Sequence, residues 1–264
     1  MTIRTVSGRI MGYDDFGAGR PLVLLHAYPL SREMWRPQIA ALSRDFRVLA
    51  PDLPGFGDSA GFADDPSIDG MAAAVAEFLD AISVTEPVAL GGLSMGGYVA
   101  MAFARKYPDR LRALILADTR AEPDDATAKA NRDKSIAFAL DKSAADVIEQ
   151  MLPRMVSAET RTERPEVVAE VRRIAGAQSV AGIVNALKAL RDRPDARPEL
   201  DNNGIPTLVL VGAEDALTPP SLSQDLAVRT RGSMEIIPGA GHLSNLERPD
   251  AFNEAVRRFL GGTS

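Results

Sequence analysis

Cysteine is absent from the 264 residues of this sequence, and histidine occurs only twice, at His26 and His242. The absence of cysteine excludes disulfide bonds, thiolate metal sites and a cysteine nucleophile together. Because histidine is so scarce, any mechanism that needs an imidazole base has only two candidates.

An excess of positive charge and long apolar runs are missing as well. The formal net charge is −6, whereas a protein that binds nucleic acid needs a basic face for the phosphates. No stretch approaches the roughly 18 uninterrupted apolar residues of a membrane-spanning helix. The opening segment MTIRTVSGRIMGYDDFG has no apolar core of signal-peptide length. We therefore expect a cytoplasmic protein whose partner is neither nucleic acid nor a membrane.

Short apolar runs alternate with helical patterns over the first 119 residues. Runs such as PLVLLH are typical of strands that are buried on both faces of a parallel sheet. Two earlier segments alternate in polarity and predict antiparallel edge strands. The expected strands are 3–6, 9–15, 21–26, 47–52, 87–92 and 111–118, and the expected helices are 34–44, 68–82 and 96–107. This order predicts an α/β fold with helices around a mostly parallel sheet.

The alternation is interrupted between residues 120 and 200. This segment is rich in Ala, Asp, Glu, Lys and Arg, and its periodicity predicts helices at 128–142, 144–155, 165–175 and 179–192. Strands return at 206–212 and 234–239, with helices near 219–230 and 250–260. We therefore expect a core domain formed by 1–119 and 201–264, with residues 120–200 as a helical insertion.

One serine lies in a glycine-rich turn between an expected strand and an expected helix. Gly92, Ser94 and Gly96 form the pattern G-x-S-x-G. At a sharp strand-to-helix turn, flanking glycines let the backbone pass closely and expose the serine hydroxyl as a nucleophile. The alternative is that Ser94 is an ordinary cap at the start of a helix.

A serine nucleophile needs a base that is itself oriented by a third group. His242 follows the last expected strand, in the loop PGAGHLSNLERP, and is the preferred base. Asp215, directly after strand 206–212, is the preferred carboxylate. Its neighbour Glu214 is a possible substitute, and Asp118, at the end of the preceding strand, is the main alternative.

These motifs, in the order Ser94, Asp215, His242, resemble those of the α/β-hydrolase fold superfamily over essentially the whole chain. The matching segments are HAYP (26–29), DLPGFGDS (52–59), GLSMGG (92–97) and GAGH (239–242). The resemblance implies a mostly parallel eight-stranded sheet flanked by helices, with a helical cap inserted after strand 6. It also implies an oxyanion hole formed by the backbone N–H groups of Tyr28 and Met95, next to Ala27, where the family usually has glycine. It assigns His26 a structural role in bracing that loop.

The expected reaction is hydrolysis of a small or medium carboxylic ester, or a lactone, through an acyl-enzyme on Ser94, with no metal or cofactor required. The alternatives are carbon–carbon bond hydrolysis, enol-lactone hydrolysis or cofactor-free perhydrolysis on the same triad, and a ligand receptor of the same fold. Arginines of the insertion, such as Arg132 or Arg154, are candidates for binding an acidic substrate. We expect a monomer or a small homo-oligomer. The candidate substrate contacts are Leu30, Met34, Trp35, Phe138, Met151, Met155, Leu217 and Leu243.

Overall fold

The computed structural model describes residues 2–6, 8–62, 65–201 and 203–262. Within these residues, eight strands form a single sheet in the order β1-β2-β4-β3-β5-β6-β7-β8. The strands from β3 onward are parallel to one another, whereas β2 is antiparallel to both β1 and β4. The strands are β1 (Thr2–Val6), β2 (Arg9–Phe16), β3 (Pro21–Leu25), β4 (Arg47–Pro51), β5 (Val88–Leu93), β6 (Leu111–Ala117), β7 (Thr207–Gly212) and β8 (Ser233–Ile237). The predicted α/β class and its mostly parallel eight-stranded sheet are confirmed.

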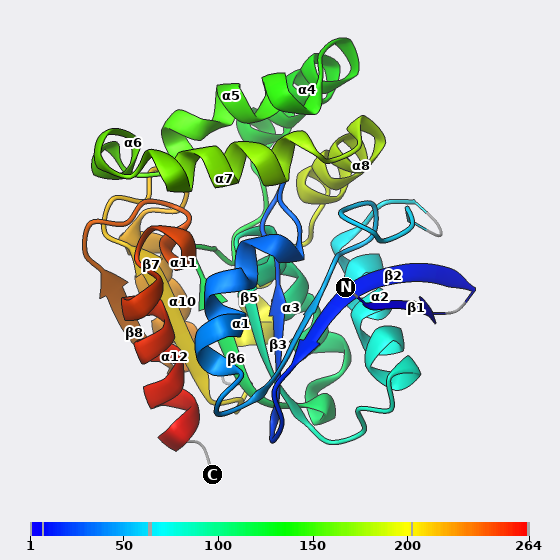
Figure 1. Ribbon diagram of the computed structural model, residues 1–264, viewed down its shortest axis with the longest axis vertical. Coiled ribbons are helices and arrows are strands. Elements are labelled where there is room, and N and C mark those ends of the chain that lie inside the picture. The colour runs from blue at the N-terminus through cyan, green and yellow to red at the C-terminus, as the bar shows by residue number, and fades with distance from the viewer. Residues whose placement is uncertain (1, 7, 63–64, 202, 263–264) are drawn as a thin grey trace.

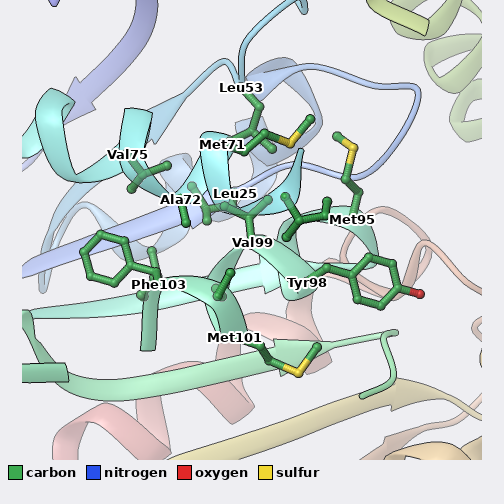
Figure 2. Packing of buried hydrophobic residues seen from close by; sticks show 14 of the residues in the cluster. Leu25, Leu53, Met71, Ala72, Val75, Met95, Tyr98, Val99, Met101 and Phe103 are labelled. Carbon is green, nitrogen blue, oxygen red and sulfur yellow. The ribbon is translucent and has the colours of Figure 1, made fainter. Parts of the chain in front are cut away.

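Helices cover both faces of this sheet (Figure 1). All residues of β3, β5 and β7 are buried, as expected for parallel strands between two helical layers. One buried cluster joins the sheet to α2 (Ile68–Ala81), α3 (Met95–Lys106) and α10 (Pro220–Thr230). The other joins it to α1 (Arg36–Leu42) and α12 (Pro249–Gly262). Figure 2 shows part of the first cluster, in which Val99 and Phe103 of α3 lie with Met71 and Val75 of α2.

The chain between β6 and β7 is helical and lies over the carboxyl ends of the parallel strands (Figure 1). Ser and Asp caps begin four of these helices, and Ser143 with Asp146 forms a capping box. The helices are α4 (Ala126–Asp141), α5 (Ala144–Met155), α6 (Ala158–Glu163), α7 (Pro165–Gly176), α8 (Val180–Arg191) and α9 (Arg197–Leu200).

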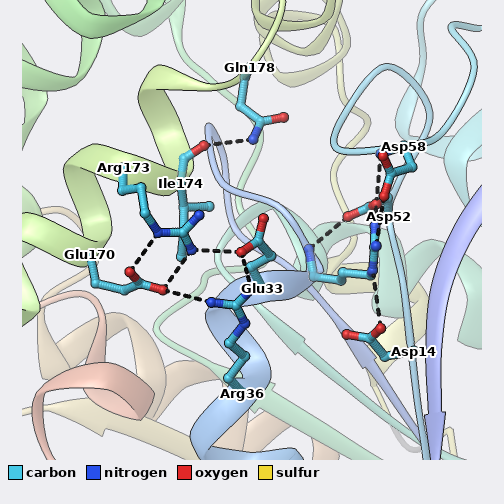
Figure 3. A network of polar contacts seen from close by, with 10 residues as sticks. Asp14, Glu33, Arg36, Asp52, Asp58, Glu170, Arg173, Ile174 and Gln178 are labelled. Carbon is cyan, nitrogen blue, oxygen red and sulfur yellow. Dashed lines mark hydrogen bonds and ion pairs between the residues drawn. The ribbon is translucent and has the colours of Figure 1, made fainter. Parts of the chain in front are cut away.

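Polar contacts connect α7 to the loops below it (Figure 3). Arg173 forms an ion pair with Glu170 on its own helix and another with Glu33 of η1 (Arg32–Trp35), the latter at 2.6 Å. All of these side chains are partly exposed, so each pair contributes only about 0 to 1 kcal/mol to stability. The buried side chain of Gln178 makes a better-protected link. It donates to the carbonyl of Ile174 at 2.7 Å and accepts the N–H of Gly57 at 2.9 Å.

The structure differs from the predicted elements mainly in short helices. The expected helix 34–44 is divided into a 3-10 turn, η1 (Arg32–Trp35), followed by α1, with Pro37 in the first turn of α1. The short helices α6, α9 and α11 (Ser244–Glu247) and the 3-10 turn η2 (Pro108–Arg110) were not expected. Each has six residues or fewer, which is too short for an apolar periodicity to show in the sequence. None of the described helices combines the length and apolar character needed to cross a bilayer.

Candidate active site

Ser94 lies at the turn from β5 to α3 in a backbone conformation that L residues rarely adopt, with φ 54° and ψ −110°. The flanking glycines make this turn possible. A Cβ at Gly92 would overlap the carbonyl of Gly96, and a Cβ at Gly96 would overlap the carbonyl of Leu25 in β3. The Ser94 hydroxyl is directed at His242 instead of the first N–H groups of α3, so the alternative of a helix cap is wrong.

The structure brings together Ser94, His242 and Asp215, which are far apart in the sequence. The Ser94 hydroxyl donates to Nε2 of His242 at 2.9 Å, and Nδ1–H of His242 donates to Oδ2 of Asp215 at 2.8 Å. A hydroxyl, an imidazole and a carboxylate in this order can pass the serine proton to the imidazole while the carboxylate holds the ring in the required tautomer.

Asp215 is held as a carboxylate by the loop that follows β7. Its Oδ1 accepts the N–H groups of Leu217 and Thr218 at 2.8 and 2.9 Å, and its Oδ2 also accepts the Thr218 hydroxyl at 2.6 Å. Burial alone would raise the pKa of Asp215, but the neighbouring His242 and the bonds from Thr218 outweigh burial and lower it. The ionised form of Asp215 is therefore favoured, and this carboxylate can stabilise the positive charge that His242 gains when it accepts a proton.

Among the described hydrogen bonds, neither of the two alternative acids contacts His242. Asp118 is buried and accepts the N–H of Gly212 at 2.8 Å, and its second oxygen is hydrogen-bonded to the Ser244 hydroxyl. Burial, and then the nearby Asp215, raise the pKa of Asp118 well above its usual value. Glu214 is exposed. The geometry thus favours Asp215 over both alternatives as the partner of His242.

A fourth acidic residue, Glu247, was missed by the sequence analysis. It is fully buried, and Oε1 accepts the N–H of Gly241 at 2.9 Å and that of Leu243 at 3.3 Å, on either side of His242. Its Oε2 accepts the N–H of Ser157, the N-cap residue of α6, at 2.8 Å. Glu247 therefore fixes the histidine loop and connects it to the helices above. The sequence holds no signal for this role, because surface helices are also rich in glutamate.

The predicted oxyanion residues lie on the loop after β3 and at the start of α3. Met95 is the first residue of α3, where backbone N–H groups have no partner within the helix. Tyr28 lies on the β3 loop, and its side chain lines the same cavity as Ser94. Ala27 is completely buried, and its carbonyl accepts the N–H of Leu30 at 2.8 Å, so this loop accommodates the methyl group in place of glycine.

His26 braces this loop as expected. Its Nδ1–H donates to the carbonyl of Ala27 at 3.0 Å, and its Nε2 accepts the N–H of Leu53 at 2.9 Å. The bond from Leu53 needs a neutral ring, because a protonated Nε2 cannot accept, and burial lowers the pKa of His26 to about 4. His26 is therefore a structural group, distinct from the candidate base His242.

This buried neutral histidine predicts an acid sensitivity of the fold. Because the pKa of His26 is about 4 in the folded chain and about 6.5 in the unfolded chain, the unfolded state binds the extra proton as the pH falls between these values. Above the pKa of the unfolded state, this difference contributes about 3 kcal/mol to the free energy of unfolding. The contribution is lost progressively as the pH falls toward the pKa of the folded state. Between about pH 7 and pH 5, the free energy of unfolding measured with urea should fall more steeply for the wild type than for His26→Gln. Equal slopes for the two proteins would contradict the assignment of His26 as a buried neutral group.

A cavity of about 530 Å³ opens above Ser94 and His242. Its floor comes from the loops of the sheet and its roof from α4, α5 and α8. Among the predicted substrate contacts, Leu217, Phe138 and Met151 line it. Its remaining walls include Tyr98, Thr218, Val147, Gln150, Leu187 and Leu190.

Five predicted contacts need correction. Within the described part of the chain, Trp35, Leu30 and Leu243 lie outside the lining of this cavity and are at most 1 % exposed. They belong to the second of the two buried clusters, the one that includes residues of α1 and α12, where Trp35 packs against Phe252 with ring centroids 6.0 Å apart. Met34 and Met155 are core residues of the same cluster. The side chains of these five residues pack into the hydrophobic core and do not line the cavity.

Two further residues that line the cavity, Tyr98 and Thr218, could be predicted from their spacing in the sequence. Tyr98 lies four residues after Ser94, and therefore one helical turn along the same face of α3. Thr218 follows Asp215 by three residues, a spacing at which a side chain often bonds back within a loop.

The chain belongs to the alpha/beta hydrolase family, whose model matches residues 22–255. It is 29 % identical over 252 residues to the 3-oxoadipate enol-lactonase 2 of Acinetobacter baylyi, covering 95 % of this chain and 92 % of the relative. It is 32 % identical over 256 residues to a pimeloyl-[acyl-carrier protein] methyl ester esterase of Neisseria meningitidis, covering 93 % and 95 % of the two chains.

Solved structures agree with this family. A thermophilic esterase from Thermogutta terrifontis, described with malate bound, superposes with a TM-score of 0.95 at 37 % identity and covers 99 % of this chain and 98 % of that one. The enol-lactonase from Burkholderia xenovorans LB400 superposes with a TM-score of 0.90 at 28 % identity, covering 98 % and 100 %. The predicted resemblance to esterase- and lactonase-like members of the family is confirmed.

Proposed function

We propose that this protein is a serine hydrolase that cleaves carboxylic esters or lactones, with Ser94 as nucleophile, His242 as base and Asp215 as its orienting carboxylate. The observation that carries the proposal is the hydrogen-bonded chain from Oγ of Ser94 through His242 to Asp215, placed at the floor of a cavity. The names of the relatives, which include esterases and enol-lactonases, support the same reaction class.

The reaction runs in two halves. Ser94 attacks the carbonyl carbon while His242 takes the hydroxyl proton, and the tetrahedral oxyanion is bound by the N–H groups of Tyr28 and Met95. Each such donor contributes roughly 3 to 4 kcal/mol to the transition state, because it already points to where charge develops. Collapse breaks the ester bond, and the leaving alcohol takes the proton from His242. His242 then activates a water molecule, which releases the acid and restores Ser94.

Residues 120–200 act in this proposal as a cap on a core formed by 1–119 and 201–264. The cavity has walls from both parts, and its volume suits a small or medium ester. Leu217, Phe138 and Met151 supply apolar surface for the acyl or alcohol portion. Location in the cytoplasm and the state of a monomer or small homo-oligomer stay predictions from the sequence.

A fluorophosphonate probe and a panel of chromogenic esters test the proposal together. The probe should modify one residue, and mass spectrometry of the peptides should locate it at Ser94, while esters of increasing acyl length are turned over. Labelling of Ser94 without any ester or lactone turnover would favour carbon–carbon bond hydrolysis or perhydrolysis on the same triad. Absence of both labelling and turnover would favour a receptor.

A further inference from the structure

The charge on the cavity wall is opposite in sign to the charge of the chain. The protein carries a net charge of −6, yet Arg120, Arg132, Lys134 and Arg154 all line the cavity. Among the described residues of the lining, Asp124 is the one carboxylate apart from the site itself. Lys134 and Arg154 are exposed, whereas Arg120 and Arg132 are about three-quarters buried, with side-chain exposures of 25 % and 26 %.

Three guanidinium groups converge on Asp124, whose side chain is fully buried. Oδ1 accepts Nη2 of Arg120 and Nη1 of Arg193, both at 2.7 Å, and Oδ2 accepts Nε of Arg132 at 3.0 Å. Burial alone would raise the pKa of Asp124, but Arg132 and Arg193 outweigh it and hold the pKa below its usual value. One carboxylate therefore faces three permanent positive charges and leaves the cluster strongly cationic.

The three arginines are not equivalent. Arg193 is buried, bonds the carbonyls of Leu190 and Glu122 at 2.8 Å each, and lies 4.3 Å above the ring of Tyr98. Its role is therefore structural. Arg132 binds Asp124 through Nε, and no described residue accepts a hydrogen bond from its two terminal amino groups, so these can serve another acceptor. Nε of Arg120 is buried and without a partner among the described residues.

The cluster is built next to the nucleophile. Arg120 follows Thr119, whose hydroxyl donates to the carbonyl of Ser94 at 2.9 Å, and the N–H of Ser94 donates to Ala117 at the end of β6 at the same distance. Arg132 and Tyr28 line the same cavity; burial raises the pKa of the Tyr28 phenol, and the positive charge of Arg132 opposes this rise. The end of β6 that holds Ser94 thus also holds Arg120, whereas Arg132 reaches the cavity from α4.

We propose that Arg120 and Arg132, held by Asp124, form a carboxylate-binding subsite, so that the preferred ester or lactone carries a free carboxylate besides the bond that is cleaved. This inference rests on the proposed function. Guanidinium groups bind carboxylates through charge-assisted, directional bonds, and they do so most strongly in a cavity shielded from water. A purely structural ion pair needs only one guanidinium for Asp124, and Arg193 already provides it.

The test compares the mono-p-nitrophenyl ester of adipic acid with its neutral methyl p-nitrophenyl diester. The wild type should prefer the anionic ester in kcat/KM by about 10-fold or more, the scale of one hydrogen bond to a charged group. In Arg132→Gln and Arg120→Gln this preference should be largely lost, a fall of about 10-fold in the ratio of the two kcat/KM values, mainly through KM, with the neutral ester changed less than about twofold. Arg191→Gln is the matched control, because Arg191 lies on α8 and pairs with the exposed Asp133 and Asp192.

A second readout does not need turnover. Free adipate should slow fluorophosphonate labelling of Ser94 in the wild type and in Arg191→Gln, and lose this protection in Arg132→Gln. Equal use of the two esters by the wild type, with no protection by adipate, would overturn the subsite and leave the esterase proposal intact. An equal loss on both esters in Arg132→Gln, with adipate protection retained, would assign Arg132 a structural role only. Failure of the proposed function itself would appear as absence of ester turnover in the wild type.

Discussion

Ser94→Ala is expected to lower kcat for a p-nitrophenyl ester by roughly 10⁴- to 10⁶-fold, because the proposed mechanism has no other nucleophile. The hydroxyl makes its bond to His242 at 2.9 Å and has no other described role in packing, so the variant should fold normally. Steady-state kinetics with protein of verified circular dichroism would measure the loss. Fluorophosphonate labelling should disappear in parallel.

The chain offers a matched control in Ser223→Ala. Ser223 is completely buried, and its hydroxyl has no hydrogen-bond partner among the described residues. Removal of this hydroxyl should therefore leave kcat unchanged. Ser94→Gly adds a test of strain. Glycine adopts positive φ without the penalty of about 1 to 3 kcal/mol that a strained non-glycine residue carries. Ser94→Gly should therefore be as inactive as Ser94→Ala but more stable; retained activity in either variant would refute Ser94 as nucleophile.

The parts of this site that could be predicted from the sequence are those that local geometry imposes. Gly92 and Gly96 are required because any side chain there would overlap a carbonyl, and this need is visible as a pattern around Ser94. The strands are visible because parallel strands buried on both faces need continuous apolar runs. The scarcity of histidine reduced the choice of base to two residues, and His26 is engaged by Ala27 and Leu53.

The side-chain directions could not be predicted in the same way. Leu217 and Leu243 both lie in loops near the site, but only Leu217 lines the cavity, while Leu243 is completely buried in the hydrophobic core. The cluster around Asp124 joins residues up to 73 positions apart, Arg120 and Arg193, with no periodic signal between them. Contacts of this kind depend on how the helices pack over the sheet, and composition alone does not specify that packing.

The choice between Asp215 and Asp118 shows the same limit and leads to the second large effect. Both residues follow neighbouring strands, so position alone leaves either as the orienter. Asp215→Asn is expected to lower kcat by about 10⁴-fold, because an amide N–H facing Nδ1 of His242 imposes the tautomer that cannot accept the Ser94 proton. The fold should persist, since the amide oxygen can still accept the N–H groups of Leu217 and Thr218.

Asp118→Asn is the isosteric counterpart, with an expected loss of less than about 10-fold. Burial raises the pKa of Asp118 and favours its neutral form, which asparagine imitates. The amide can still accept the N–H of Gly212 and donate to the Ser244 hydroxyl, so the bonds that Asp118 makes survive. Side-by-side kcat values on one ester, with thermal unfolding of both variants, make the comparison. A severe loss in Asp118→Asn with near-normal turnover in Asp215→Asn would transfer the orienting role to Asp118 and require the loop of Asp215 to move away from His242 during the reaction.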